Sequence, residues 1–475
     1  MKDVLDKVVE GSRAVAIICN QWGDTGKGKF SNLFAKYWAD VVVRGTGGNN
    51  AGHTVVINGK KRIFHLLPTG IIYDKDGKIN ILGNGMVLDL KVLCTELAEL
   101  DKERISYDKL MISEDANVIM PYHISRDLDK DASSKKGGIG STGKGIGPCY
   151  TDKIARRGIF VRDLLKENIL KTKLEKVKSF YPKVEIDSEK IISDLKPFIE
   201  KIKPFVKDTI TEINDFYSEG KKILIEGAQG LLLSIEYGTY PYVTSSDPSL
   251  NGTATGTGLC ARNIYPLGIV KFPFMTRVGG GPFPSELGGE ESENYCAEGL
   301  EHDIKFELDK YKIPFEVIKG NVKYNHSHPN IISLMNSKYD FEKGIGIRLA
   351  AEEYGATTGR PRRTGWTDLP ALKFATYFNG MNIILTKVDA ISGAKKFSLV
   401  ESYGEEKFSR DCDSLRFRKP IFKEFEGFEK KISDIKAYDN LPNGLKDSID
   451  FLEKTIGAKV KIVSVGPDQN ETIVR

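Results

Sequence analysis

The chain has 475 residues, of which 40% are hydrophobic and 28% are charged, and its formal net charge is +5. This composition is ordinary for a soluble globular protein, and the charge is too small to indicate nucleic-acid binding by itself. The six cysteines lack the paired spacing of a zinc or redox site. No apolar run is long enough to span a membrane, and the first residues do not form a signal peptide. We therefore expect a cytoplasmic protein with no nucleic-acid or membrane partner.

The first predicted elements are a buried strand at residues 14–19 and an amphipathic helix that begins near residue 30. Between them, the sequence QWGDTGKGK forms a glycine-rich turn of the kind that points backbone N–H groups at a phosphate. Residues 23–29 fit a phosphate loop, except that Phe30 follows where a Ser or Thr would hold Mg²⁺. If the loop serves a metal-assisted reaction, Asp24 is the candidate ligand. The alternative is a glycine-rich turn with solvated lysines.

The next predicted strand, at residues 41–43, ends in a small and polar loop at residues 44–54. Such a loop lets the backbone approach a ligand, and His53 is its only titratable side chain. Further elements follow in chain order: strands near 61–67 and 78–82, a helix near 89–101, a glycine-rich stretch at 137–148, and Lys/Glu-rich helices between about 162 and 219 that break near Pro182 and Pro204.

Two later strands, at residues 222–226 and 267–271, also end in polar, glycine-rich loops. In an open parallel sheet, ligands bind at the carboxyl ends of the strands. The alternation of strands and helices, with every strand ending in such a loop, indicates an α/β fold around a mainly parallel sheet.

Two stretches near the C-terminus carry candidate anion- and base-binding groups. Three arginines lie within four positions in a Gly/Pro-constrained loop at residues 355–366, and arginine binds carboxylate or phosphate bidentately. The strand at residues 383–386 then delivers Lys387 and Asp389. This spacing resembles the guanine-reading Lys-x-Asp element of GTP-binding proteins, in which the carboxylate accepts hydrogen bonds from the ring N–H and the amino group.

The segment at about residues 290–343 is more polar than the rest and contains His326 and His328. The histidine pair has no carboxylate or cysteine at metal spacing. We expect a surface excursion here.

Together these stretches resemble the adenylosuccinate synthetases, which are GTP-dependent ligases that join aspartate to IMP. The resemblance runs from Gln21 to residues 463–468 and covers nearly the whole chain outside residues 290–343. The motifs that carry it are specific as an ordered set: NAGHT at 50–54, GAQG at 227–230, GTYPYVTSS at 238–246 and TTGR at 357–360.

The resemblance implies one large α/β domain over residues 1–475 and a homodimer. It also implies a two-step reaction, in which the 6-oxygen of IMP attacks the γ-phosphate of GTP and the amine of aspartate then displaces the phosphate. Asp24 would be the base on the purine, His53 would donate to the phosphoryl group, Lys27 would neutralise the phosphates, and Mg²⁺ would be bound by Asp24 and the carbonyl of Gly52.

The same resemblance implies four groups of site residues. The catalytic residues would be Asp24, Lys27, His53 and Gln229. IMP would be bound by Asp24, Asn50, Thr142, Arg156, Gln229, Thr244 and Arg360, with Arg156 reaching into the partner subunit. Aspartate would be bound by Thr357, Thr358, Arg360 and Arg362. GTP would be bound by Gly23, Gly26, Lys27, Gly28, Lys29, Gly52, His53, Thr54, Arg362, Lys387, Asp389, Ser464 and Gly466.

The chain departs from the family pattern at two places. Thr25 stands where the family usually has Glu, which changes the charge beside the proposed base. A phage branch of the family acts on dGMP, so a relative with another purine substrate is one alternative. The excursion at residues 290–343 is longer than the usual connection. A non-catalytic GTP-binding module is a further alternative, although the arginine loop is more than such a switch requires.

Overall fold

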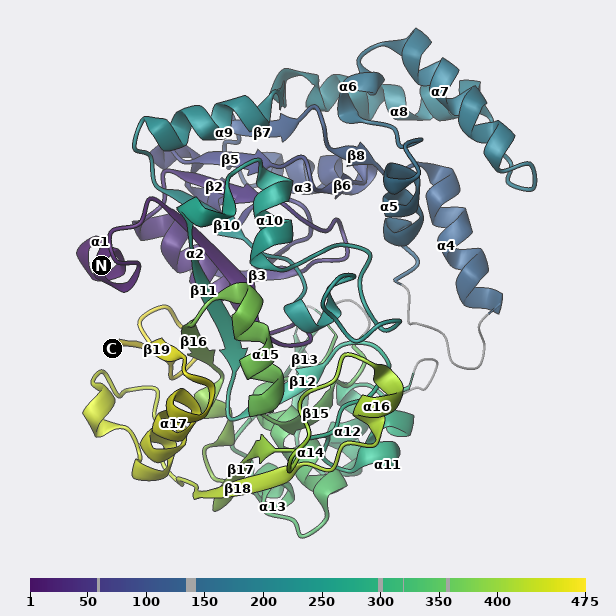
Figure 1. Ribbon diagram of the computed structural model, residues 1–475. Coiled ribbons are helices and arrows are strands. Elements are labelled where there is room, and N and C mark those ends of the chain that lie inside the picture. Colours follow the sequence, from purple (N-terminus) through teal and green to yellow (C-terminus); the bar gives the residue numbers. More distant parts are fainter. Residues whose placement is uncertain (58–59, 134–141, 298–301, 319, 356–358) are drawn as a thin grey trace. The chain divides into compact units, whose positions relative to one another are not determined.

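A computed structural model describes residues 1–57, 60–133, 142–297, 302–318, 320–355 and 359–475 (Figure 1). The chain divides into two compact units. The first consists of Met1–Ile18, Lys27–Glu236 and Val243–Pro266, and the second of Cys19–Gly26, Tyr237–Tyr242 and Leu267–Arg475. No helix in these described ranges is both long and apolar enough to cross a lipid bilayer.

Parallel strands form the centre of the first unit. They pair in the order β1 (Ala14–Cys19), β10 (Ile223–Glu226), β2 (Val41–Arg44), β5 (Ile79–Leu82), β7 (Leu110–Ser113) and β9 (Val206–Lys207). Every residue of β1, β2 and β10 is buried, and most are Val, Ile, Leu or Ala. A parallel sheet covered on both faces requires such continuous apolar runs, because neither face meets water.

Helices cover this sheet, as the chain's periodicity predicts. Helix α3 shows the local cause, since the Asp89 side chain caps it by accepting from the amides of Lys91 and Val92. The α-helices of the unit are α1 (Lys2–Val8), α2 (Lys27–Tyr37), α3 (Leu90–Lys102), α4 (Pro121–Ser133), α5 (Ile146–Ile154), α6 (Val161–Leu164), α7 (Glu167–Phe180), α8 (Ser188–Ile202), α9 (Thr209–Ser218) and α10 (Leu250–Thr257). Its 3₁₀ turns are η1 (Thr69–Asp76), η2 (Lys203–Phe205), η3 (Leu231–Leu233) and η4 (Ala261–Asn263).

A hairpin and a short strand pair complete the first unit. The hairpin is β3 (His53–Ile57) with β4 (Lys60–Phe64), and the pair is β6 (Val87–Leu88) with β8 (Asn117–Val118). The strand predicted at residues 61–67 is thus shorter, and it pairs locally rather than with the central sheet. The helices predicted between 162 and 219 are confirmed, with breaks after Phe180 and Ile202.

The second unit has its own strands in the order β20 (Thr472–Val474), β19 (Lys459–Ser464), β16 (Asn382–Thr386) and β11 (Ile264–Lys271). The last three are parallel and β20 is antiparallel. Around them lie the strand pairs β12 (Phe274–Arg277) with β15 (Arg363–Trp366), β13 (Phe315–Ile318) with β14 (Asn321–Tyr324), and β17 (Lys396–Ser402) with β18 (Ile421–Glu426).

The helices of the second unit pack on one large apolar core. They are α11 (Gly289–Tyr295), α12 (Ile304–Lys310), α13 (Pro329–Met335), α14 (Asp340–Ala351), α15 (Leu369–Asn379), α16 (Cys412–Arg416) and α17 (Asn443–Ile456), with 3₁₀ turns η5 (Val388–Ile391) and η6 (Tyr438–Asn440).

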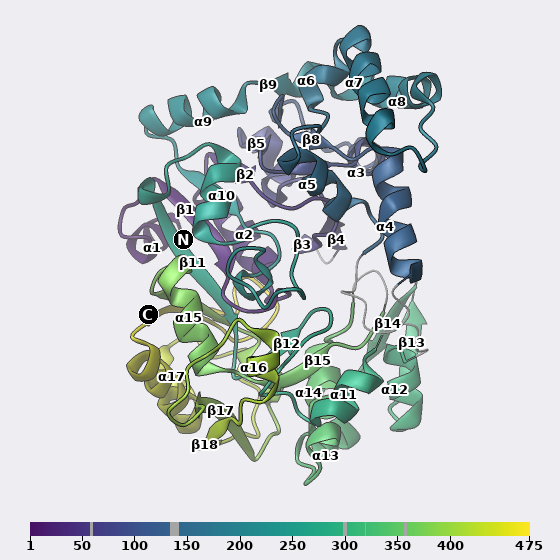
Figure 2. The same ribbon diagram turned by 45° about the vertical axis from the view of Figure 1, so that its right-hand side comes forward.

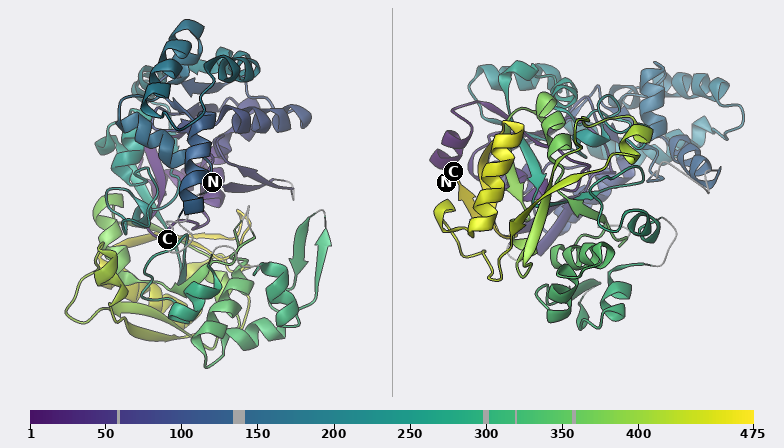
Figure 3. Two further views of the ribbon diagram at one scale, coloured as in Figure 1. Left: turned by 90° about the vertical axis from the view of Figure 1, so that its right-hand side faces the viewer. Right: turned by 60° about the horizontal axis from the view of Figure 1, so that its bottom comes forward.

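Most described residues of the segment 290–343 are exposed or half-buried, but the segment is not entirely a surface excursion, because parts of it are buried. Leu308, Ile331 and Met335 are buried in the core of the second unit, whereas the hairpin β13–β14 is largely exposed. Figures 2 and 3 show this hairpin extending from the edge of that unit. The helices here are short, so a few apolar residues among many polar ones are enough to bury one face of each.

Candidate active site

The glycine-rich turn after β1 is a strand–turn–helix unit, as predicted. Gly23, Asp24 and Gly26 have φ values of 84°, 52° and 74°, so the turn depends on left-handed backbone that glycine adopts without strain. Helix α2 begins at Lys27. The ring of Phe30 is fully buried, which explains why this position carries no hydroxyl ligand. The backbone amides at the start of α2 are therefore a suitable phosphate site.

In the first unit, Lys27 and Gln229 meet. Lys27 is buried, and its Nζ donates to the carbonyl oxygen of Gln229 at 2.7 Å. Gln229 has a φ of 48°, and neither atom of its side-chain amide has a hydrogen-bond partner in the part of the chain that the structure describes. A Cβ atom at Gly47 would lie 3.0 Å from Gln229 Oε1, so only glycine leaves that amide its space. A buried amide without a partner is costly, which indicates a ligand that completes it.

His53 is held by a carboxylate that the sequence analysis did not select. Its Nδ1 lies 3.1 Å from Glu226 Oε2, and Glu226 Oε1 accepts hydrogen bonds from the backbone and hydroxyl of Thr69. Because Glu226 accepts, the Nδ1 atom carries the proton. Burial lowers the pKa of His53, and the charges of Arg44 and Lys27 lower it further, although Glu226 opposes the shift. The ring is therefore neutral at pH 7.

In the second unit, Asp24 and Arg362 form an ion pair. The Nε atom of Arg362 lies 3.0 Å from Asp24 Oδ2, and the Asp24 side chain is 43% exposed. The predicted base and a predicted anion-binding arginine thus contact each other directly. The Asp24 carboxylate is open to solvent while the Arg362 side chain is only 22% exposed, so an anionic ligand that reaches Arg362 can take the place of Asp24.

Glu353 connects two lysines of the second unit. Lys271 is fully buried, and its Nζ donates to Glu353 Oε2 at 2.6 Å and to Thr276 Oγ1 at 2.8 Å. Burial lowers the pKa of Lys271, against the opposing effect of Glu353. The Nζ of Lys387 donates to the Ala351 carbonyl oxygen at 2.7 Å and lies 3.7 Å from Glu353 Oε1. Lys387 thus braces the chain before the arginine loop.

The three arginines of the loop have different partners. Arg363 is buried and binds Glu286 through Nε at 2.9 and 3.1 Å, which makes it a structural residue. The Nε of Arg360 donates to the Cys296 carbonyl oxygen at 2.6 Å. Thr357 and Thr358 lie outside the described residues.

The remaining predicted site residues occupy varied positions. Thr142 and Arg156 are exposed, Asn50 and Thr244 are half-buried, and Ser464 is buried with its hydroxyl donating to the Gly466 carbonyl at 3.0 Å. Thr54 lies in β3, and Asp389 is the second residue of the turn η5.

Oxygen atoms suited to Mg²⁺ are available at the predicted positions. Asp24 offers a solvent-accessible carboxylate, and Gly52 is exposed. Hard oxygen donors are the ligands that Mg²⁺ prefers, so these residues fit the ion. Among the described residues, no cluster of three His, Cys, Asp or Glu side chains could hold a metal alone. His326 Nδ1 lies 3.4 Å from the Leu349 carbonyl and His328 caps α13, so both serve local structure.

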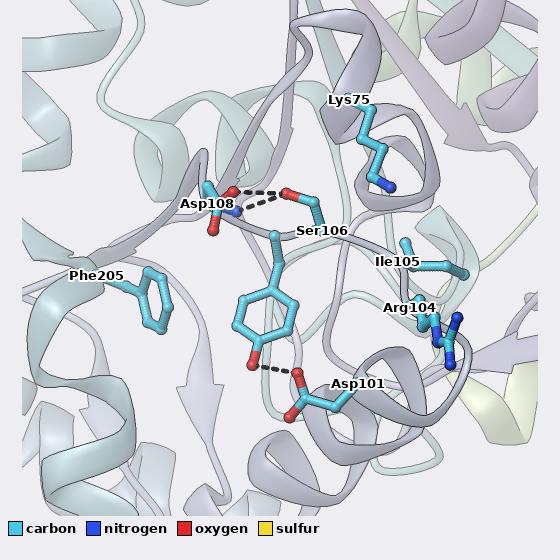
Figure 4. Close-up of a pocket in the computed structure, with 8 residues that line it drawn as sticks. Lys75, Asp101, Arg104, Ile105, Ser106, Asp108 and Phe205 are labelled. Carbon is cyan, nitrogen blue, oxygen red and sulfur yellow. Dashed lines mark hydrogen bonds between the residues drawn. The ribbon is translucent and has the colours of Figure 1, made fainter.

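A surface hollow in the first unit lies elsewhere (Figure 4). It is lined by Lys75, Arg104 and Phe205, among others, near the points where β5, β7 and β9 begin. The polar groups at its wall bond to each other, with Tyr107 donating to Asp101 at 2.7 Å and Ser106 to Asp108 at 2.9 Å. Ligands of parallel sheets bind at the opposite, carboxyl ends of strands. This hollow is therefore not the candidate site.

Comparison with known proteins agrees with this geometry. A model of the adenylosuccinate synthetase family matches residues 16–473. The chain belongs to the adenylosuccinate synthetase family. Curated adenylosuccinate synthetases from Halothermothrix orenii and Clostridium perfringens are each 38% identical to it, over 97% of this chain and 98% of each relative. The predicted family and its enzymatic nature as a GTP-dependent ligase are confirmed.

Solved structures of adenylosuccinate synthetase type confirm the α/β fold class. The fully ligated adenylosuccinate synthetase from Plasmodium falciparum matches with a TM-score of 0.79 and 31% identity, covering 98% of this chain and 100% of that one. The succinoaminodeoxyadenylate synthetase of cyanophage S-2L, bound to dGMP and dATP, matches with a TM-score of 0.54 and 17% identity, covering 98% and 95%. That second likeness is one of fold alone.

The sequence analysis missed three charged residues: Glu226, which pairs with His53; Glu353, which lies 3.7 Å from Lys387; and Lys271, which pairs with Glu353. Two of them had a usable signal. Glu226 and Lys271 are the charged last residues of otherwise apolar strands, and a charge at the end of a buried strand points to a partner there. Glu353 follows a helix and has no such signal.

Proposed function

We propose that the protein joins L-aspartate to IMP at the expense of GTP, giving adenylosuccinate, GDP and phosphate through a 6-phosphoryl-IMP intermediate. The observation that carries this proposal is the group formed by His53, Lys27 and the amide of Gln229, which has no partner among the described residues; these residues follow β2, β1 and β10, respectively. Phosphoryl transfer depends on positioning and charge neutralisation, and these three side chains supply both.

The first step is phosphoryl transfer from GTP to the 6-oxygen of IMP. Asp24 accepts the proton of purine nitrogen 1, so that the 6-oxygen can attack the γ-phosphate. Lys27 and the amides of Gly26 and Gly28 bind the phosphates. In its protonated form, which takes its second proton from solvent and is favoured by the phosphate charge of bound GTP, His53 donates from Nε2 to the transferring group while Glu226 accepts from Nδ1, and this stabilises the charge that develops there.

Asp24 and the carbonyl of Gly52 would hold Mg²⁺ and so provide the ligands that Phe30 cannot, and the bound ion would neutralise phosphate charge. Arg362 is released from Asp24 when it binds an anion, which leaves the Asp24 carboxylate open to metal and purine. Arg360 and Arg362, together with Thr357 and Thr358, bind aspartate for the second step.

The remaining family residues complete the substrate sites. IMP is held by Asn50, Thr142, Gln229, Thr244, Arg360 and the Arg156 of a partner subunit, and the guanine by Lys387, Asp389, Ser464 and Gly466. We propose a homodimer for this reason: Arg156 is exposed at the end of α5, with a φ of 60°. We also propose that residues 1–475 act as one synthetase domain, in the cytoplasm, where its six free cysteines stay reduced.

The dGMP-type alternative is motivated by Thr25. Its side chain is buried and its hydroxyl has no partner among the described residues, while its carbonyl accepts from Thr386 at 2.8 Å. A family glutamate would add a charge there. Identity of 38% to adenylosuccinate synthetases, against 17% to the phage enzyme, favours IMP.

Phosphate release tests the proposal against a GTP-binding switch. We expect release from GTP only when both IMP and aspartate are present. A switch would hydrolyse GTP slowly without them, and equal rates with and without the two substrates would overturn the ligase assignment.

A further inference from the structure

A buried polar cluster in the second unit contacts the backbone of the arginine loop. Its centre is Glu307, on α12, which is fully buried. The carboxylate accepts from Arg348 through Nε at 3.2 Å and through Nη2, and it also accepts from the hydroxyl of Tyr354. Arg348, on α14, is also buried. This cluster is not part of the reaction described above.

Arg348 connects the cluster to the loop. Its Nη1 donates to the carbonyl oxygen of Arg362 at 3.0 Å and lies 3.7 Å from the sulfur of Cys296. The carbonyl oxygen of Cys296 in turn accepts from Arg360 Nε at 2.6 Å. Both arginines that we assign to aspartate are therefore fixed by groups from residues 290–351, one through its backbone and one through its side chain.

The base of the loop is closed on itself. The Gly355 amide donates to the Arg360 carbonyl at 2.8 Å, and the Arg362 amide to the Glu353 carbonyl at 3.0 Å. These bonds set the spacing of the two chain segments, and the Arg362 carbonyl oxygen itself accepts from Arg348 Nη1 at 3.0 Å and from the hydroxyl of Thr364 at 3.2 Å. Of these two donors only Arg348 is charged, so its displacement would remove the stronger bond and loosen the peptide that follows Arg362.

Charge keeps the cluster in one state. Burial alone would lower the pKa of Arg348, but Glu307 raises it above its ordinary value. Burial and Glu307 both raise the pKa of Tyr354, so its hydroxyl remains a donor. Removal of one partner leaves the other charge buried and unpaired, which is strongly unfavourable. Arg348 would then move toward another acceptor, and its hydrogen bond to the Arg362 carbonyl would be lost or displaced.

We propose that Glu307 is a positioning residue for the arginine loop: acting through Arg348, it sets the direction of Arg362 and hence the affinity for aspartate. The proposal rests on the proposed function for its substrate. It gives α12, which lies in the unusually long segment at residues 290–343, a role in substrate binding.

The test compares Glu307→Gln with the matched control Asn330→Ala. Asn330 lies on α13 of the same segment and donates to the carbonyls of Tyr311 at 2.9 Å and Lys312 at 3.3 Å, away from the loop. We expect Glu307→Gln to raise the KM for aspartate about ten-fold, with smaller changes in the KM for IMP and GTP. Asn330→Ala should leave all three unchanged.

A second readout does not depend on the reaction. Amide hydrogen exchange at residues 359–363 of the ligand-free protein should be faster in Glu307→Gln than in Asn330→Ala or the native chain. If Glu307→Gln fails to fold, Tyr354→Phe removes one hydroxyl donor to Glu307 and should show the same two changes at smaller size.

The outcomes separate the two proposals. An inactive native protein would overturn the proposed function. The amide hydrogen exchange measurement would still decide whether Glu307 orders the loop. If the native protein is active, but Glu307→Gln matches Asn330→Ala in exchange and in KM for aspartate, the positioning role is wrong. A fall in kcat alone, with KM unchanged, would also contradict it.

Discussion

The loops of the two units differ in how their polar groups are held. In the first unit, His53 is buried and neutral, and its carboxylate partner Glu226 is fixed by Thr69. In the second unit, Asp24 and Arg362 form an ion pair that is open to solvent. The first arrangement is pre-set, because buried hydrogen bonds are costly to break. The second is exchangeable, because an exposed ion pair contributes only about 0–1 kcal/mol.

This difference corresponds to different tasks. A fixed imidazole whose protonated form is favoured as charge develops suits a transition state, where charge appears at one place and reorganisation would be costly. An exchangeable arginine suits the capture of a free anion such as aspartate, because the substrate must bind and the product that contains it must later dissociate. The comparison predicts that changes in the first unit alter kcat, and that loop changes in the second unit alter KM, with Asp24 as the exception because it also acts in the chemistry.

The largest effect is expected for Asp24→Asn. Asparagine keeps a hydrogen-bond acceptor for Arg362 but cannot take the proton of the purine, and loss of a general base costs about 10²–10⁴-fold in rate. Steady-state kinetics of the folded variant, checked by circular dichroism, measure this. Turnover within a few-fold of the native rate would show that Asp24 is not the base. Its role would then be limited to the ion pair with Arg362.

Glu226→Gln should come next. The amide can still face His53, but a neutral partner no longer favours the protonated ring in the transition state. Hydrogen bonds to charged groups contribute about 1.5–3 kcal/mol, so kcat should fall about 10- to 100-fold with little change in KM. A matched control is Glu96→Gln, another buried carboxylate of the first unit, which accepts from the amides of Leu66 and Leu67. A loss confined to KM would contradict the fixed-donor account.

Asp389→Asn should change the choice of nucleotide by about ten-fold, because an unpaired buried polar group costs about 1–3 kcal/mol. The native protein should use GTP at least this much better than ATP. The variant should shift toward xanthosine triphosphate, whose 2-oxo group offers an acceptor where guanine has a donor. Kinetics with the three nucleotides measure the shift. Equal use of ATP and GTP by the native protein would contradict the assignment of Asp389 to guanine recognition.

The sequence predicts the local elements of the fold and many candidate site residues, but not the contacts between residues that are far apart in the chain. Strand β1, the glycine turn and α2 follow from apolar runs and glycine spacing, which are local signals. The burial of Leu308 and Ile331 was not predictable, because helices of seven residues show too few turns for a clear period. The partners Glu226 of His53 and Glu307 of Arg348 are 173 and 41 residues away in sequence, so only the fold reveals them.

The smallest effect on activity is expected for Asp368→Asn, which should leave kinetics unchanged. Burial raises the pKa of Asp368 to about 6 from 3.8. The folded state therefore binds the proton more tightly, and this stability is complete below pH 3.8 and is lost as pH rises through 6. Asparagine carries no such proton, so the variant should gain about 3 kcal/mol relative to the native protein between pH 3.5 and 7.

Denaturant unfolding of both proteins across that range measures the gain. A constant difference at all pH values would show that Asp368 titrates normally, and that buried charge in the second unit behaves no differently from exposed charge.

The proposed ligation of aspartate to IMP can be tested through its product. The most direct measurement incubates the native protein with GTP, Mg²⁺ and aspartate, and with IMP, dIMP, GMP or dGMP in turn, and detects the succinylated product by mass. We expect adenylosuccinate from IMP as the main product. A succinylated product from dGMP but none from IMP would contradict it and assign the chain to the other purine.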